Sequence, residues 1–119
     1  MPASVDWHYH RANCETCSKA KAFLDEHGVT SREVVLARQV AIEPTTAWAM
    51  LEKVQHLAVV RGSKVYEFER AQFVDQHEQI ESMIIGRSGS LRAPTIRVGP
   101  TMIVRYEPSL YSRAIGVTR

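Results

Sequence analysis

Cysteine occurs only twice in this chain, at Cys14 and Cys17, with two residues between them. This spacing puts the two thiols within reach of a shared disulfide and is typical of redox-active dithiols. An extended segment precedes the pair and a helical one follows, so unpaired backbone N–H groups and the positive end of the helix dipole point at the first sulfur. We therefore expect Cys14 to be the nucleophile. Cys17, one turn into the helix, would attack the mixed disulfide that Cys14 forms.

The residues alone leave two other interpretations of the cysteine pair open. One is a structural zinc site that His8 and His10 complete, because zinc takes four cysteine or histidine ligands. The other is a pair of small buried residues without chemistry. His10 has two interpretations of its own: a packed strand histidine, or a group that stabilises a Cys14 thiolate. Glu15 opposes that thiolate, since it adds negative charge beside the sulfur.

The elements around the motif are those that such a site needs. Residues 5–10 alternate aromatic residues and histidines at the two-residue period of a strand. After Cys17, the apolar residues Ala20, Phe23 and Leu24 recur at helical spacing. Gly28 is placed to end that helix as a C-cap. The predicted order is therefore strand, dithiol, helix.

Length, composition and charge limit the kinds of protein that this chain can be. The chain has 119 residues, 45% of them apolar and 24% charged, with a formal net charge of +2. These values predict one domain, residues 1–119, with a hydrophobic core. Because the basic residues are scattered and largely matched by acids, we expect no nucleic-acid or membrane partner. With no apolar run at the N-terminus, we expect a cytoplasmic protein, where a CxxC pair is kept mostly reduced.

The rest of the chain predicts a mixed α/β fold built on a small sheet. The segment 31–37 is β-branched and apolar, which favours a buried second strand. We assign no element to 56–68. The other expected elements are helices from Pro44 to about Val54 and at 73–85, a flexible loop at 86–90, a hairpin at 93–106 that turns at Gly99 and Pro100, and a terminal helix at 107–115.

These segments resemble the arsenate reductase-like (ArsC/Spx) branch of the thioredoxin fold over nearly the whole chain. Residues 9–20 are similar to the opening of that family, in which Tyr-His-Asn-Pro-x-Cys precedes the first helix, and His10 falls on the family histidine. Residues 59–62 resemble its Leu-Leu-Arg segment, 91–94 its Leu-Ile-x-Arg-Pro segment, and 104–105 its last strand.

The resemblance implies a thioredoxin-like α/β fold, with a small mixed four-stranded sheet flanked by helices and a helical insertion. It also implies a reactive Cys14, a cis Pro94 facing it and an anion pocket formed by arginines. The candidate catalytic residues are thus Cys14, Cys17 and His10, with no metal. The candidate substrate-binding residues are Arg61, Arg105, Arg92, Pro94 and Thr95.

The chain departs from the family pattern at the anion pocket. Ala93 stands where the family has the arginine before the proline, and Arg92 lies one place earlier, which on a strand would turn it to the opposite face. Arg11 and Ala12 replace the family Asn-Pro. We therefore expect weak or no arsenate reduction, with disulfide reduction retained.

The sequence thus predicts a thiol-disulfide oxidoreductase acting on a small thiol or protein disulfide. It would hold no bound cofactor and would draw electrons from glutathione or thioredoxin. One alternative is an Spx-like redox-sensing regulator that binds a protein partner such as RNA polymerase. The other is a weak arsenate reductase. No sequence feature separates an enzyme from a switch.

Overall fold

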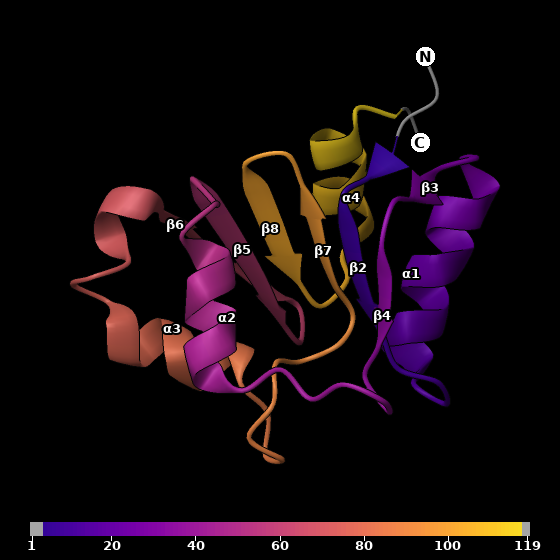
Figure 1. The fold of residues 1–119 in the computed structure, drawn as a ribbon. Coiled ribbons are helices and arrows are strands. Elements are labelled where there is room, and N and C mark those ends of the chain that lie inside the picture. The colour runs from indigo at the N-terminus through magenta and orange to yellow at the C-terminus, as the bar shows by residue number, and fades with distance from the viewer. Residues whose placement is uncertain (1–3, 118–119) are drawn as a thin grey trace.

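A mixed β-sheet with helices on both faces forms the body of the computed structural model, which describes residues 4–117 (Figure 1). The elements in chain order are β1 Ser4–Val5, β2 Trp7–His10, α1 Glu15–Glu26, β3 Thr30–Ser31, β4 Val34–Leu36, α2 Pro44–Leu51, β5 His56–Arg61, β6 Lys64–Glu69, a short 3-10 helix Arg70–Gln72, α3 His77–Ile84, β7 Thr95–Val98, β8 Thr101–Val104 and α4 Pro108–Ile115.

The main sheet has six strands in the order β4-β2-β7-β8-β5-β6, and β1 and β3 form a separate two-stranded parallel pair. The prediction of a four-stranded sheet is therefore wrong. The two additional strands, β5 and β6, form a hairpin from the region to which the sequence assigns no element. Gly62 allows this tight turn because its φ of +60° is costly for other residues.

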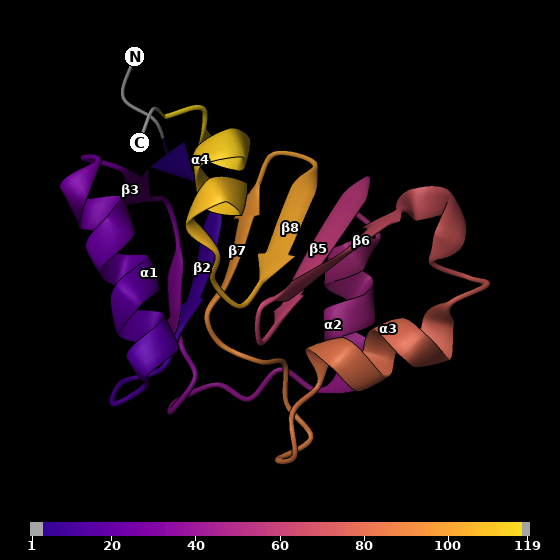
Figure 2. The same ribbon diagram turned by 180° about the vertical axis from the view of Figure 1, so that it is seen from behind.

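Two hydrophobic layers lie on opposite faces of the sheet. One face packs against α1 and α4, as the shared burial of Phe23, Ile103 and Tyr111 indicates. The other packs against α2 and α3, where Leu51 and Ile80 join the core. Figure 2 shows α1 and α4 in front of the sheet, with α2 behind it. None of the helices in residues 4–117 is long and apolar enough to cross a membrane.

Several elements agree with the sequence. The helix after the dithiol ends before Gly28, whose φ is +66°, and Val29 N–H donates to Leu24 C=O at 2.9 Å. The hairpin β7–β8 and the helix α4, with Pro108 at its start, also form as expected. Glycine and proline residues mark the ends of these segments in the sequence. The segments can therefore be predicted without knowing which elements pack against them.

Three predicted segments differ. The 31–37 strand is an edge strand: Val34 is 51% exposed and Leu36 41%. The predicted helix 73–85 begins only at residue 77. Helix α2 ends at Leu51, and Arg70 Nη1 donates to the carbonyls of Leu51, Glu52 and Val54 at 3.2, 2.7 and 2.9 Å, which satisfies acceptors at this helix end.

Candidate redox site

One end of the sheet gathers the sequence-predicted residues. Strands β2, β5 and β8 run in the same direction, so their carboxyl ends meet there. Cys14 follows β2, Arg61 ends β5, and Arg105 follows β8. The antiparallel β7 begins at the same end, where Thr95 pairs with Tyr9. This is the end of an α/β sheet at which ligands usually bind.

Cys14 caps the N-terminus of α1. Its Sγ accepts a hydrogen bond from the Cys17 backbone N–H at 3.3 Å, and its C=O accepts from Ser18 N–H at 2.9 Å. Asn13, with φ +59°, turns the chain into the helix. Cys14 is half-buried and both cysteines are free thiols. The Cys14 sulfur is therefore reachable from solvent and lies at the positive end of the helix dipole.

Cys17 is fully buried, and its thiol is less acidic than an ordinary cysteine thiol. Burial raises its pKa to about 12, and a hydrogen bond with Cys14 adds to the rise. A backbone hydrogen bond at Arg11 and the positive charge of Arg105 oppose it in part. Cys17 is thus held as a neutral thiol next to Cys14, and it must lose its proton before it can attack a disulfide.

Arg105 connects the start of α1 to the start of β7. Its Nη2 donates to Thr16 Oγ1 at 3.2 Å, and its backbone N–H donates to Pro94 C=O at 2.7 Å. The residue adopts φ +76°, a left-handed conformation that is uncommon outside glycine and asparagine. These contacts fix the guanidinium beside the helix that carries both cysteines.

Arg92 lies with the other arginines rather than turned away from them. The strand-alternation argument does not apply, because β7 begins only at Thr95. Burial, and next the positive charges of Arg105, Arg61 and Arg87, lower the pKa of Arg92. Its Nε donates to the Met83 carbonyl at 3.1 Å, which holds the side chain in place.

The four guanidinium groups of Arg61, Arg87, Arg92 and Arg105 have no ion pair within residues 4–117. Mutual repulsion makes such a cluster costly, and a bound anion would relieve it. We name these four residues the arginine cluster. The sequence names three of its members as candidate substrate-binding residues, and the structure adds Arg87 to them.

Pro94 and Thr95 shape the chain beside the cluster. The Ala93–Pro94 peptide is cis, as predicted. Thr95 is fully buried, and its hydroxyl donates to the Arg92 carbonyl at 2.7 Å. That bond commits the hydroxyl, so Thr95 positions the segment that carries Arg92 and does not offer a free donor to a substrate.

His10 contacts His8 and makes no hydrogen bond with the thiols among the described residues. Its ring stands edge-on to that of His8, with centroids 5.7 Å apart. His8 is buried, which lowers its pKa to about 4, as do the charges of His10 and Lys21, while Asp25 opposes them. Residues 4–117 hold no cluster of three or more His, Cys, Asp or Glu side chains suited to a metal ion.

Three residues that support the candidate redox site were not predicted from the sequence. Thr16 holds Arg105, and Arg87 adds charge to the cluster. Ser90 anchors the loop that carries Arg87: its hydroxyl accepts from Ile42 N–H at 3.0 Å and contacts Tyr9 Oη at 3.3 Å. The only local signal was the arginine inside a Gly- and Ser-rich loop, which predicted flexibility instead.

Comparison with known proteins yields no relative for this chain. No family model matches it, and neither a curated protein nor a solved structure matches it significantly. The chemistry of the site therefore rests on its own geometry. Two adjacent thiols differ in burial, a backbone N–H donates to the half-buried Cys14 sulfur, and an arginine cluster without an ion pair in residues 4–117 lies at the same end of the sheet.

Proposed function

We propose that this protein is a thiol-disulfide oxidoreductase in which Cys14 attacks and Cys17 resolves. One observation carries the proposal: the half-buried Cys14 sulfur accepts a backbone N–H at the start of α1, while the adjacent Cys17 thiol is fully buried with a raised pKa. Two thiols so arranged differ in access to solvent, so the first can meet a substrate while the second stays behind it, within reach of the first sulfur.

The proposed fold family is thioredoxin-like, of the arsenate reductase-like branch. Support comes from the four neighbouring strands β4-β2-β7-β8, in which only β7 is antiparallel to the rest, and from the dithiol between β2 and α1. In this proposal β5, β6 and α3 are the insertion between α2 and β7. The insertion supplies Arg61 and the loop with Arg87.

The proposed reaction moves two electrons from the dithiol to a disulfide. The Cys14 thiolate attacks one sulfur of the substrate, forming a mixed disulfide and releasing the other sulfur as a thiolate. Cys17 then loses its proton and attacks the Cys14 sulfur, which forms the Cys14–Cys17 disulfide and releases the second substrate thiolate. An external dithiol or two molecules of a monothiol, of the thioredoxin or glutathione class, restore the reduced protein.

The arginine cluster would select the substrate. Guanidinium groups bind carboxylates and tetrahedral anions through two parallel hydrogen bonds, so a disulfide with carboxylate groups, such as that of glutathione, fits the site. The proximity of Arg92 to Arg61 and Arg105 also favours a second candidate, arsenate reduction. With Arg92 included, the candidate anion pocket keeps three arginines, although Ala93 stands where the family has an arginine.

A turnover assay tests the proposal. Reduced protein would be supplied with glutathione disulfide, a protein disulfide or arsenate, with a glutathione- or thioredoxin-linked reductase system to report electron flow. We expect turnover of a disulfide that Cys14→Ser abolishes. Oxidation that occurs once without turnover would identify a redox switch instead, and no reaction of either thiol would contradict both.

A further inference from the structure

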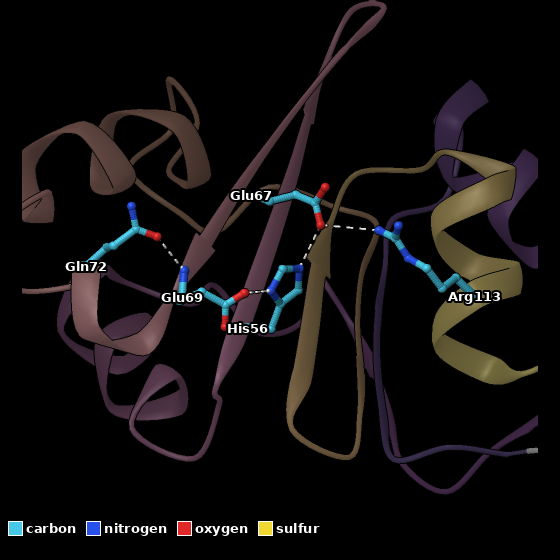
Figure 3. A network of polar contacts seen from close by, with 5 residues as sticks. All are labelled: His56, Glu67, Glu69, Gln72 and Arg113. Atoms are coloured by element: carbon cyan, nitrogen blue, oxygen red, sulfur yellow. Dashed lines mark hydrogen bonds and ion pairs between the residues drawn. The ribbon is translucent and has the colours of Figure 1, made fainter.

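The two edge strands of the main sheet are protected very differently. Strand β6 carries Lys64, Glu67 and Glu69, and charged residues at an edge oppose pairing with another chain. Figure 3 shows these carboxylates held by their neighbours: His56 contacts both glutamates at 2.8 and 2.7 Å, and Arg113 binds Glu67 at 3.2 Å. In the same view, the Gln72 side chain accepts a hydrogen bond from Glu69 N–H at 2.8 Å.

The opposite edge, β4, has no such protection. Its residues Val34, Val35 and Leu36 are all apolar. Val34 and Leu36 are exposed, as is Val40 in the turn that follows, at 51%, 41% and 45%. The sequence predicts a buried strand here, and the described chain provides nothing that buries it. An apolar, β-branched strand left at an edge is a site for strand pairing.

The backbone of β4 points hydrogen-bonding groups outward. Glu33 C=O accepts from His8 N–H at 2.9 Å, and Ala37 N–H donates to a carbonyl of β2 at 2.8 Å. Odd-numbered residues therefore face β2, so Val34 and Leu36 direct their N–H and C=O groups to the open side. In residues 4–117, β4 pairs with β2 alone.

Of these two residues, only Val34 has both groups open. Leu36 C=O already accepts from Gln39 N–H and Val40 N–H, at 2.9 and 3.0 Å. A hydrogen-bonded pair of an antiparallel ladder exchanges two bonds between one residue of each strand. Val34 is thus the position at which an added strand gains most.

A hollow of about 380 Å³ lies between β4 and α1, on the face where Val34 and Leu36 project. Apolar side chains supply most of its walls, and Lys21 and Asp25, paired at 2.9 Å, lie at its rim. An added strand would extend this apolar surface. The lining also includes His8, His10, Leu24, Val29, Thr30 and Ser31.

We propose that β4 is the interface of a homodimer, in which a second copy adds antiparallel to β4 about a two-fold axis at Val34. Val34 of each copy then exchanges both backbone hydrogen bonds with Val34 of the other, so the same groups satisfy one another. The alternative register, Val34 against Leu36, needs the carbonyl that is already occupied and sets Arg32 opposite Arg38.

The charges near the edge fit this arrangement. The two-fold axis reverses the direction of α1, so the half of α1 with Lys21 in one copy approaches the half with Asp25 in the other. Because Lys21 and Asp25 already pair within each copy at 2.9 Å, the axis sets the two ion pairs in opposite directions, so each lysine faces the side of the other copy's aspartate rather than of its lysine. A second copy is therefore an occupant whose backbone and charges both complement this edge.

Analytical ultracentrifugation of the reduced protein over a range of concentrations tests the proposal. The mass should rise from that of one chain toward that of two. Val34→Lys should weaken association by about tenfold or more, because two lysines would face each other at the axis. The matched control is Val65→Lys on β6, 39% exposed, which should associate as the unmodified protein does.

Hydrogen exchange followed by NMR provides a second readout that does not depend on a substitution. The Val34 amide should become more protected as the concentration rises, while the Val65 amide should not change. A protein that stays monomeric, a Val34 amide whose exchange ignores concentration, or equal effects of Val34→Lys and Val65→Lys would overturn the dimer. Such results leave the redox proposal untouched, since Cys14 lies outside this edge.

Discussion

Charged side chains at the two ends of the sheet differ in whether they have partners of opposite charge. At one end Arg61, Arg92 and Arg105 lie near each other, and Arg105 contacts the start of the helix that follows Cys14. None of the three has a carboxylate partner in residues 4–117. At the other end His56 lies between Glu67 and Glu69 at 2.8 and 2.7 Å (Figure 3). The same sheet thus carries one cluster that neutralises itself and one that does not.

This difference separates stability from function. Paired charges satisfy one another, whereas an unpaired cluster costs free energy until a ligand supplies the opposite charge. The unpaired end is also the one with a half-buried thiol at a helix start. Substitutions in the arginine cluster should therefore change the activity, whereas equivalent substitutions around His56, Glu67 and Glu69 should not.

The largest expected effect comes from the thiols themselves. Cys14→Ser should lower disulfide turnover by at least about a thousandfold, because a hydroxyl at that position is not an effective nucleophile. Cys17→Ser should retain the first step and accumulate a mixed disulfide on Cys14. Steady-state assays and intact mass measurement distinguish the two. If Cys14→Ser is as active as the unmodified protein, the end of the sheet with the thiols is not the site of the reaction.

Acid should destabilise the fold through His8. Its pKa is about 4 in the folded protein and near 6.5 when unfolded, so the unfolded chain binds more protons between these values. The free energy of unfolding should fall as the pH drops from 6.5 to 4, by up to about 3 kcal/mol from this group. Denaturant unfolding at several pH values measures it. His8→Leu should flatten this dependence, and an unchanged slope would assign it to other groups.

The arginine cluster should control affinity for anionic substrates. Arg92→Ala or Arg105→Ala should raise the KM for glutathione disulfide by about tenfold or more, since a charge-assisted hydrogen bond contributes about 1.5–3 kcal/mol. Arg113→Ala, an exposed arginine at the paired end, is the matched control and should leave KM unchanged. If all three variants behave alike, the two ends do not differ in the way that we describe.

The smallest effect should come from the paired end. Glu67→Gln removes the carboxylate shared by His56 and Arg113, all on the surface. Exposed ion pairs contribute about 0–1 kcal/mol, so the free energy of unfolding should change by less than about 1 kcal/mol and turnover should not change. Urea unfolding and the disulfide assay check both. A large loss of turnover would extend the site to this end.

Prediction from the sequence succeeded where short-range signals sufficed. The dithiol at the start of α1, the glycine that ends it and the hairpin at Gly99 each follow from neighbouring residues. The hairpin β5–β6 was not predicted, because its strands differ in burial and only their pairing reveals them. The exposure of β4 was not foreseen either, since a β-branched apolar run reads alike at an edge and in the centre of a sheet.

The residue types of the candidate site are evident in the sequence, but their arrangement in space is not. The sequence predicts that Arg92 points away, as it would on a strand, but in the structure Arg92 precedes β7 and lies within the electrostatic reach of Arg105. For His10 the sequence leaves open a packed strand histidine and a partner of Cys14, and the structure shows its ring edge-on to His8. Loop conformation decides both outcomes, and alternation rules do not describe loops.

The central claim is that Cys14 and Cys17 form a reversible intramolecular disulfide. Mild oxidation of the reduced protein, followed by alkylation and intact mass spectrometry, tests it most directly. We predict the loss of two hydrogen atoms, no alkylatable thiol, and full recovery of both thiols on reduction. Two alkylatable thiols after oxidation, or a disulfide found only between chains, would contradict it.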